Sequence, residues 1–551
     1  MQKSFFARLL CPPYSISAAS LSVATFIVVF DNQLFWHNIA ARLDSSSPDH
    51  WRLMLTCGTI LILLFNLFFT LFSFRPFFKP FLIGILFVGA AVSYFADAYG
   101  IVIDKSMIQN ILETNVREAG ELITWPLLWR LSLHGGLPAV LVAMTRIRYP
   151  SWQSGMLLRI GAITVSFSLA VALFMTDFKG FVLFGRENRD LQVFMNPTYP
   201  VYASIKVVKA KYFAPLNQPF RAIATDALRI RSPYRSVVVL VVGETARANS
   251  LPENGYSRDT TPYTSGRDVI SFSDVESCGT STAESVPCMF SAFGRGGFSK
   301  TQAENTENLL DVLKRTGVKV VWRDNDSGSK KVADRVIFED FSKRKDSPFC
   351  TDDNCYDEVL LEGLDNLIRG NQEDMLIVLH IMGSHGPSYY KRSPAEFKVF
   401  LPECTQDNVQ DCPRDSIVNA YDNTIVYTDY VLGKVIDILN DQDADTAMLY
   451  LSDHGESLGE NGIYLHGLPY TLAPVEQTHV PMVFWASDKF LFDRHLDRKS
   501  LQSRSNEPYS QDYLFHSMLG LYRVKTDLYR KDQDLFLGEA RLPIATSNHQ
   551  L

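Results

Sequence analysis

A carboxylate and a hydroxyl in the middle of this 551-residue chain, Glu244 and Thr282, could act together in one chemical step. Glu244 comes directly after the β-branched run Val237–Val242, and Thr282 lies in a turn of small residues beside a predicted helix start. The run has the composition of a buried central strand, and open α/β sheets bind their ligands where such strands end. A hydroxyl near a helix N-terminus that faces a carboxylate could act as a nucleophile. We therefore expect Glu244 and Thr282 to belong to one site.

Polar clusters also follow the other predicted strands. These strands are Val318–Trp322, Met375–His380, Ala447–Leu451 and Val480–Trp485. After them come further polar residues, namely Asp326, Ser327, Lys330, His385, Asp453, His454, Glu456 and His466. Because parallel strands place their carboxyl ends at one edge of a sheet, we expect these clusters to converge.

A metal ion would give this constellation its chemistry. Glu244, Asp453 and His454 offer oxygen and nitrogen ligands that suit zinc or manganese, and the Thr282 oxygen adds a fourth ligand. A threonine hydroxyl is protonated at neutral pH, and a divalent cation can stabilise its alkoxide. A second metal or the phosphate itself could be held by His385, His466, Lys330 and Glu456. The pattern predicts transfer or hydrolysis of a phosphate or sulfate ester through a covalent intermediate.

A simpler interpretation of the Asp453–Glu456 segment is a capped helix start, with its acids near the positive end of the helix dipole. That interpretation explains the acids but not the histidines. A single His-Gly pair, such as those at His385 and His466, is usually a turn or a surface histidine, so only the whole cluster supports a site.

The elements that must position these residues alternate between strands and helices from Val237 onward. Helices are predicted at Glu304–Thr316, Asp357–Arg369, Ser416–Leu439 and Gln511–Leu521. Such alternation is typical of a largely parallel sheet with helices on both faces. We expect residues 236–551 to form one catalytic α/β domain.

The first third of the chain has a different composition. Five apolar stretches there reach the roughly 20 residues that a membrane span requires: Ser15–Phe35, Arg52–Phe74, Pro80–Ile101, Leu122–Met144 and Leu157–Met175. The first lacks a small-residue cleavage site and is interpreted as an anchor. Asp97, Arg130 and His134 lie near span ends, which favours interfacial anchoring. We expect a transmembrane domain over residues 1–176. Residues 177–235 fit either helices on the membrane surface or an ordinary linker.

Charge and cysteine distribution indicate where the catalytic part lies. Short connections between spans carry basic residues, namely Lys3, Arg8, Arg75, Lys79, Arg146 and Arg148, which predicts a cytoplasmic N-terminus and an external domain beyond Asp177. Cys11 and Cys57 lie in the membrane part, and the other six cysteines form three close pairs, Cys278 with Cys288, Cys350 with Cys355, and Cys404 with Cys412. Disulfides suit an oxidising compartment, whereas zinc ligation, the alternative, fits the spacings poorly. The net charge of -7 gives no argument for nucleic acid binding.

The motifs GETARANS, SCGTSTAESVPCMFS, WRDNDSGSK, GSHGP, AYDNT and SDHGESLGENGIYLHG resemble those of the phosphoethanolamine transferases. The resemblance is strongest to the lipid A-modifying branch, which includes the mobile colistin-resistance enzymes, and it covers nearly the whole chain. It implies five spans in the inner membrane of a Gram-negative bacterium, followed by a periplasmic α/β domain of the alkaline phosphatase superfamily, in a monomer.

The resemblance also implies residue roles. Thr282 would be the nucleophile, and Glu244, Asp453 and His454 would bind with it one zinc ion, with a second zinc or the phosphoryl group at His385 and His466. Substrate contacts would come from Thr280, Asp326, Ser327, Lys330 and Glu456. Thr282 would take phosphoethanolamine from phosphatidylethanolamine and pass it to a phosphate of lipid A, which gives polymyxin and colistin resistance.

Two departures and several alternatives accompany the resemblance. The segment DNDSGSKKVADR lacks a cysteine pair that many relatives carry beside it, and Asp326 stands where some relatives have asparagine. The acceptor could be a core sugar, a glucan or a protein, or the enzyme could be a membrane-tethered phosphodiesterase or phosphatase. A sulfatase is disfavoured because Thr282-Ala283-Glu284 lacks the C/S-x-P-x-R signature. A lipid-binding protein without activity is disfavoured by the complete set of candidate residues.

Overall fold

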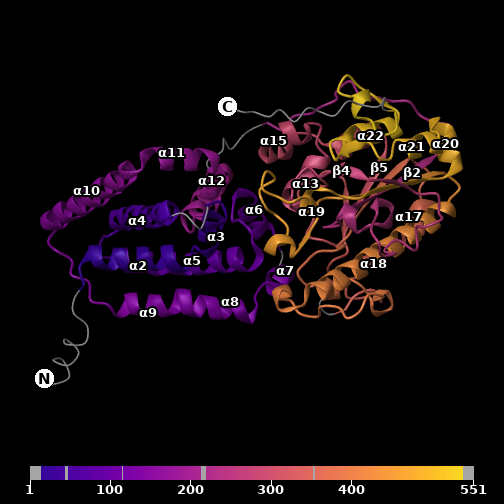
Figure 1. The fold of residues 1–551 in the computed structure, drawn as a ribbon. Helices are drawn as coiled ribbons and strands as arrows, with labels where there is room; N and C mark the ends of the chain where they lie inside the picture. Colours follow the sequence, from indigo (N-terminus) through magenta and orange to yellow (C-terminus); the bar gives the residue numbers. More distant parts are fainter. Residues whose placement is uncertain (1–13, 44–47, 115, 213–218, 352–353, 538–551) are drawn as a thin grey trace. The chain divides into compact units, whose positions relative to one another are not determined.

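The computed structural model of the protein describes residues 14–43, 48–114, 116–212, 219–351 and 354–537. The chain divides into two compact units, each with its own core (Figure 1). Unit 1 comprises Met1–Ile108 and Ile123–Val208, and unit 2 comprises Gln109–Leu122 and Lys209–Leu551. Gln109–Leu122, between two predicted spans, thus groups with the α/β part and not with the helices that flank it. Lys3, Arg8 and Cys11 lie outside the described residues.

Unit 1 is helical, because long apolar runs must satisfy their backbone polar groups internally. Within the described residues, four helical stretches are long and apolar enough to cross a membrane: Trp51–Leu71, Phe78–Tyr99, Trp125–Met144 and Trp152–Thr176. The first predicted span instead forms α2 (Ile16–Phe30) and α3 (Gln33–Ala41), which are bent by 55° and give a fifth span only if they are taken together.

The helices of unit 1 follow one another through short connections. α6 (Lys105–Glu113) begins in unit 1 and ends in unit 2. The remaining ones are α4 (Pro48–Leu71), α5 (Phe78–Tyr99), α8 (Trp125–Arg130), a π-helical turn (Leu131–Gly136), α9 (Leu137–Met144), α10 (Trp152–Thr176), α11 (Phe178–Glu187) and α12 (Thr198–Tyr212). The last two fall within residues 177–235, where the sequence predicts either helices on the membrane surface or a linker.

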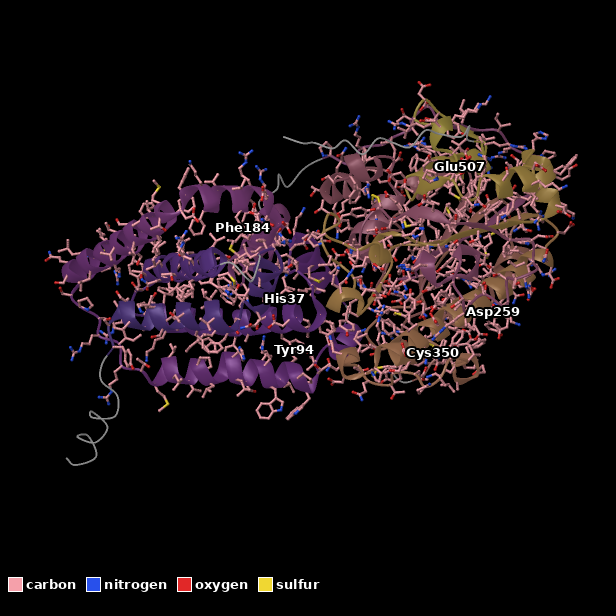
Figure 2. All side chains as sticks on the ribbon, in the orientation of Figure 1. His37, Tyr94, Phe184, Asp259, Cys350 and Glu507 are labelled. Carbon is pink, nitrogen blue, oxygen red and sulfur yellow. A yellow bond between two sulfur atoms is a disulfide. The ribbon has the colours of Figure 1, made fainter. Side chains whose placement is uncertain are left out.

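Polar side chains inside unit 1 pair with one another. Arg130 forms an ion pair with Asp97, and His134 Nδ1 lies 2.7 Å from Oδ1 of the buried Asp31. Tyr94, labelled in Figure 2, shares a hydrogen bond of 2.8 Å with the Thr124 hydroxyl. These contacts link α2, α5, α8 and the π-helical turn to one another. The sequence favours interfacial anchoring for Asp97, Arg130 and His134, and the structure shows that they also pair inside unit 1.

The described part of unit 2 contains a mixed sheet of seven strands in the order β3-β11-β8-β2-β7-β5-β6. The strands are β2 (Ser236–Gly243), β3 (Ile270–Phe272), β5 (Lys319–Asp324), β6 (Ile337–Asp340), β7 (Met375–His380), β8 (Asp445–Ser452) and β11 (Met482–Ala486). Strands β8, β2, β7, β5 and β6 run parallel to one another. The two strands at the other edge, β11 and β3, are antiparallel to their neighbours.

Helices cover both faces of this sheet (Figure 1). Alternate residues of β2, such as Val238 and Leu240, pack with Leu310 of α16 (Leu309–Arg315) and Phe515 of α22 (Tyr513–Leu521). On the opposite side lie α17 (Leu364–Arg369) and the long α18 (Arg414–Asn440). Other helices are α7 (Val116–Glu121), α13 (Thr282–Met289), α14 (Gly294–Gly297), α15 (Lys300–Glu304), α19 (Val475–Thr478), α20 (Asp488–Arg494) and α21 (Arg498–Ser503).

Three disulfides occur in the described part of unit 2, and each joins neighbours in the sequence. They link Cys278 with Cys288, Cys350 (labelled in Figure 2) with Cys355, and Cys404 with Cys412. Cys57 of unit 1 is a free thiol. The pairing is the local one that the sequence predicts.

Two predicted helices are interrupted. The predicted helix Glu304–Thr316 is wrong in its first turn, because α15 ends at Glu304 and α16 begins only at Leu309, with Asn308 as its N-cap. The Asn308 side chain accepts from the backbone of Leu310 and Asp311, and the Asp311 carboxylate accepts from the Asn308 backbone. The predicted helix Asp357–Arg369 is a 3₁₀ turn followed by α17, separated at Gly363, whose φ is 64°.

The Asn308 cap gives a prediction for stability. Asn308→Ala removes the acceptor for the first turn of α16 and the 2.8 Å bond from Nδ2 to the Val332 carbonyl. We expect a loss of about 1–2 kcal/mol and a fall in melting temperature of at least about 2 °C, measured by thermal unfolding of the detergent-solubilised protein. Asn308→Ser, the matched control, keeps a capping oxygen and should lose less. An unchanged melting temperature for Asn308→Ala would show that the cap does not stabilise unit 2.

Candidate active site

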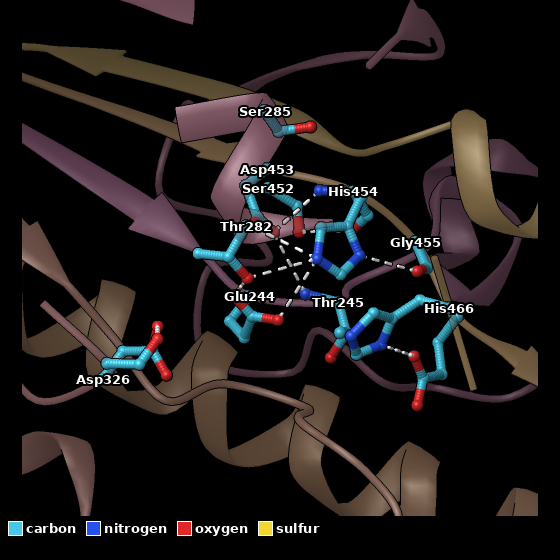
Figure 3. Close-up of polar contacts among 12 residues, drawn as sticks. Glu244, Thr245, Thr282, Ser285, Asp326, Ser452, Asp453, His454, Gly455 and His466 are labelled. Carbon is cyan, nitrogen blue, oxygen red and sulfur yellow. Dashed lines mark hydrogen bonds and ion pairs between the residues drawn. The ribbon is translucent and has the colours of Figure 1, made fainter. Parts of the chain in front are cut away.

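Glu244 and Thr282 meet, as the sequence predicts. Glu244 follows the last residue of β2 and is fully buried, and Thr282 is the first residue of α13. The Thr282 hydroxyl donates to Glu244 Oε2 at 2.9 Å (Figure 3). The Cys278–Cys288 disulfide closes a loop that contains Thr282, so the position of the hydroxyl is restrained from both sides. Thr245, next to Glu244, has a φ of 55°, a conformation that costs of order 1–3 kcal/mol outside glycine.

Asp453 and His454 reach the same place from the end of β8. His454 Nε2 lies 3.4 Å from Thr282 Oγ1, 3.4 Å from Glu244 Oε1 and 3.3 Å from Asp453 Oδ2. His454 Nδ1 lies 3.0 Å from the Gly455 carbonyl, which keeps the Nδ1 proton and leaves the Nε2 lone pair free. The backbone from Asp453 to Glu456 is not helical, so a capped helix start does not account for these residues.

This group of atoms fits a divalent cation. Four ligands at zinc distances in a tetrahedron lie roughly 3.3 Å from one another, and the separations around His454 Nε2 are 3.3–3.4 Å. Glu244 Oε1 and Asp453 Oδ2 are buried and have no hydrogen-bond partner among the described residues. Unpaired buried carboxylate oxygens are costly unless a cation binds them. The residues therefore have the donor set, the spacing and the orphaned atoms that a zinc site requires.

Two more histidines border this group. The Nδ1 atom of His466 is 2.7 Å from Glu456 Oε2, and the other Glu456 oxygen accepts from the Tyr389 hydroxyl at 2.6 Å. Glu456, predicted to contact substrate, is thus engaged in orienting His466. The His466 ring centroid lies 4.4 Å from that of His454 and 5.5 Å from that of His385, so the three rings form one imidazole wall.

Of the remaining predicted residues, Asp326 lies beside Glu244, whereas Lys330 and Thr280 bond to groups outside the site. Asp326 is buried near Glu244, and Ser327 Oγ donates to its Oδ2 at 2.9 Å. Lys330 Nζ, however, bonds to the carbonyl and hydroxyl oxygens of Ser327, at 3.0 and 2.7 Å. The Thr280 hydroxyl donates to the Leu468 carbonyl at 2.6 Å, so in this conformation it holds a loop and is not directed at Thr282.

The electrostatics of the site depend on its burial. Burial and the charges of Asp453 and Asp326 raise the pKa of Glu244 well above its ordinary value. Burial raises the pKa of Asp453 to about 6. Burial and the neighbouring His466 lower the pKa of His454 well below its ordinary value and that of His385 to about 3, so both rings are neutral ligands or hydrogen-bonding groups near pH 7.

Three positioning residues were not predicted. His380, the last residue of β7, lies fully buried with Asp326 and Glu244, and its Nδ1 is 2.9 Å from Asp324 Oδ2. The Gln511 side chain donates to the carbonyls of Ser452 and Asp453 and accepts from the Cys278 backbone. The Arg392 side chain donates to the His385 carbonyl at 2.9 Å and pairs with Glu121 of α7 at 2.6 Å. The signal for His380 was its place at a strand end; nothing local in the sequence marks Gln511 or Arg392.

Known protein families and individual known proteins are similar to both parts of the chain. Residues 236–524 match the family described as Sulfatase, and residues 61–212 match the family described as phosphoethanolamine transferase EptA/EptB. Phosphoethanolamine transferase EptA of Salmonella typhimurium is 38% identical over 551 residues, which cover 98% of this chain and 100% of that protein. Phosphatidylethanolamine transferase Mcr-1 of Escherichia coli is 40% identical over 481 residues, or 84% of this chain and 88% of that protein.

Among solved structures, the integral membrane protein lipooligosaccharide phosphoethanolamine transferase A of Neisseria meningitidis is similar over both units. It has a TM-score of 0.92 and 35% sequence identity, and the match covers 96% of this chain and 100% of that one. The chain therefore belongs to the phosphoethanolamine transferases of the alkaline phosphatase superfamily.

Proposed function

We propose that the protein transfers phosphoethanolamine from phosphatidylethanolamine to a phosphate group of lipid A, with Thr282 as the covalent carrier. The observation that carries this proposal is the Thr282 hydroxyl, bonded to Glu244 at 2.9 Å within a buried set of zinc-type ligands. The name of Mcr-1 supports phosphatidylethanolamine as the donor, and that of the Neisseria enzyme supports a lipid-anchored saccharide as the acceptor.

In the first half-reaction, Thr282 Oγ attacks the phosphorus of phosphatidylethanolamine. The bond between phosphorus and the glycerol oxygen breaks, and diacylglycerol leaves. Glu244 Oε2 is the acceptor for the hydroxyl proton as the attack begins. His466, whose Nδ1 is held by Glu456, presents its other nitrogen to the site and is placed to protonate the leaving oxygen.

A zinc ion held by Glu244, Asp453, His454 and Thr282 would stabilise the threonine alkoxide and the charge on the phosphoryl oxygens. His454 contributes a neutral Nε2 because its Nδ1 proton is held at the Gly455 carbonyl. Burial of this group excludes bulk water, which favours transfer to a second substrate over hydrolysis.

In the second half-reaction, a phosphate oxygen of lipid A attacks the phosphorus on Thr282, and the Thr282 oxygen leaves. His466 now accepts the proton of the attacking phosphate, as microscopic reversibility requires, and Glu244 returns to the Thr282 oxygen the proton that it took in the first half-reaction. Both substrates are lipids, which accounts for a catalytic unit in one chain with membrane-spanning helices. We place the enzyme in the inner membrane with a cytoplasmic N-terminus, residues 1–176 as its transmembrane domain and residues 236–551 as its periplasmic domain. Masking of lipid A phosphates with ethanolamine would then weaken the binding of polymyxins.

The nucleophile gives the first functional prediction. Thr282→Ala should lower diacylglycerol release from fluorescent phosphatidylethanolamine by roughly a thousandfold or more, because no oxygen remains to attack phosphorus. Intact-protein mass spectrometry should detect a phosphoethanolamine adduct on the wild type and none on the variant. Thr282→Ser, the matched control, keeps the hydroxyl and should retain the adduct. Diacylglycerol release that survives Thr282→Ala would exclude this nucleophile.

Metal dependence gives the second functional prediction. Dialysis of the purified protein against a zinc chelator should abolish diacylglycerol release, because Glu244 and Asp453 would then repel each other where the cation held them together. Added Zn²⁺ should restore the rate in the wild type but not in Asp453→Asn. Full activity after chelation, with metal content confirmed as zero, would contradict the zinc assignment.

The identity of the phosphoethanolamine acceptor gives the third functional prediction. Expression in a polymyxin-sensitive Gram-negative host should add phosphoethanolamine to lipid A, detected by mass spectrometry, and should raise the minimal inhibitory concentration of colistin. Expression of Thr282→Ala at the same level should do neither. Unmodified lipid A together with modified core sugar, glucan or protein would keep the transfer chemistry and reassign the acceptor.

A further inference from the structure

A second group of metal-type ligands lies beside the first. Glu244, Asp326 and His380 each present one ligand atom within 4.8 Å of the others. Their side chains are buried, with 0%, 4% and 0% of their surface exposed. Figure 3 shows Asp326 on one side of Glu244 and His466 on the other, and Glu244 belongs to both groups.

Each residue of this group has one side-chain atom without a hydrogen-bond partner in the described part of the chain. His380 Nε2, Asp326 Oδ1 and Glu244 Oε1 are all buried and unpaired within the described part of the chain. A buried polar atom without a partner destabilises the fold, because it has lost its bonds to water and gained none in return. Three such atoms on residues that lie this close together indicate a bound group that satisfies them, and two carboxylates with one imidazole nitrogen indicate a cation.

A hydrogen bond to Asp324 holds the His380 ring in an orientation that suits a metal ligand. Its Nδ1 lies 2.9 Å from Asp324 Oδ2, which keeps the proton on Nδ1 and leaves the Nε2 lone pair free. Asp324 is fixed in turn by the indole N–H of Trp322 at 2.8 Å and by the backbone N–H of Gly328 at 3.0 Å. A carboxylate that holds the far nitrogen of an imidazole is the usual support of a metal-binding histidine.

A proton shared between His380 and Asp326 is the competing explanation. A charge-assisted N–H···O bond would bring the two atoms to about 2.7–2.9 Å, whereas His380 Nε2 and Asp326 Oδ2 are 3.6 Å apart. That separation is close to the roughly 3.3 Å between two ligands of a tetrahedral zinc. A proton would also leave the Glu244 oxygen unsatisfied. Lys330 does not replace the cation, because its ammonium group bonds to Ser327.

We propose that Asp326, His380 and Glu244 bind a second divalent cation of the zinc or manganese class, with Glu244 shared between the two sites. Three protein ligands leave a coordination position open, as in catalytic zinc sites. The binding of this cation stands on the geometry alone. Its role, which rests on the proposed function, is to stabilise an oxygen of the phosphoryl group on Thr282 as the second metal of a two-metal site.

Metal stoichiometry tests the proposal directly. The full-length protein in detergent is equilibrated with Zn²⁺, and the bound ions per chain are counted by mass spectrometry of the metal. We expect about two ions for the wild type, about one for Asp326→Asn and for His380→Gln, about one for Asp453→Asn, and none for Asp326→Asn combined with Asp453→Asn. Asp340→Asn, the same substitution at an exposed carboxylate on β6, should retain two. One ion in the wild type, or two in Asp326→Asn, would overturn the proposal.

Anomalous scattering at the zinc edge locates the ions without any substitution. A peak between Asp326 and His380 supports the site, and a second peak found only between His385 and His466 overturns it. Diacylglycerol release separates the two proposals. Two bound ions with no cleavage of phosphatidylethanolamine would refute the function and leave the site, whereas cleavage with one bound ion would refute the site and leave the function.

Discussion

Mutual repulsion among buried carboxylates is the constraint on which the rest of unit 2 depends. Glu244, Asp324, Asp326 and Asp453 are at most 4% exposed and gather at one edge of the sheet. Two like charges about 4 Å apart repel by roughly 4 kcal/mol at the effective dielectric of a protein. Protons and cations both relieve this repulsion: the pKa values of Glu244 and Asp453 are raised, and Asp324 and Asp326 raise the pKa of His380 although its burial lowers it. The same field makes this edge of the sheet a favourable place for a bound cation.

The fold meets this constraint with backbone contacts at the strand ends. Strands β8, β2 and β7 are neighbours, and the loops that follow them bond to the end of β2: Asp453 N–H to the Gly243 carbonyl, and Ser384 N–H to the Glu244 carbonyl. Gly383 permits this approach, because its φ is 50° and a Cβ there would lie 2.7 Å from the Glu244 carbonyl oxygen. Carboxylates on separate loops are thereby fixed by main-chain bonds that do not depend on their charge.

Much of this arrangement could be predicted from the sequence, because it depends on local patterns. The apolar run before Glu244 marks a central strand, and Met375–His380 has the predicted bounds. Strand direction could not be predicted in the same way. Val480–Trp485 has the same apolar composition as the parallel strands of the sheet, but β11 runs antiparallel to both of its neighbours, and nothing within an apolar run encodes its direction.

Contacts between distant residues account for what could not be predicted. The sequence predicts only that His380 ends a strand, because its partners Asp324 and Asp326 lie on the adjacent strand and loop. The sequence predicts a substrate contact for Glu456, whereas the structure shows its oxygens bonded to His466 and Tyr389. In both cases the residue type was visible in the sequence, while the partner that determines its function was not.

The position of Gln511 has a consequence for the order in which the protein matures. Its side chain joins the Cys278 backbone to the carbonyls of Ser452 and Asp453, three segments separated by up to 233 residues of chain. Contacts of such long sequence separation form late in folding, because loop closure must precede them. The carbonyls of Ser452 and Asp453 therefore gain these bonds only after the segment that carries Gln511 has packed against the site. Completion of the candidate site therefore belongs to the end of folding, after nearly the whole chain has been synthesised.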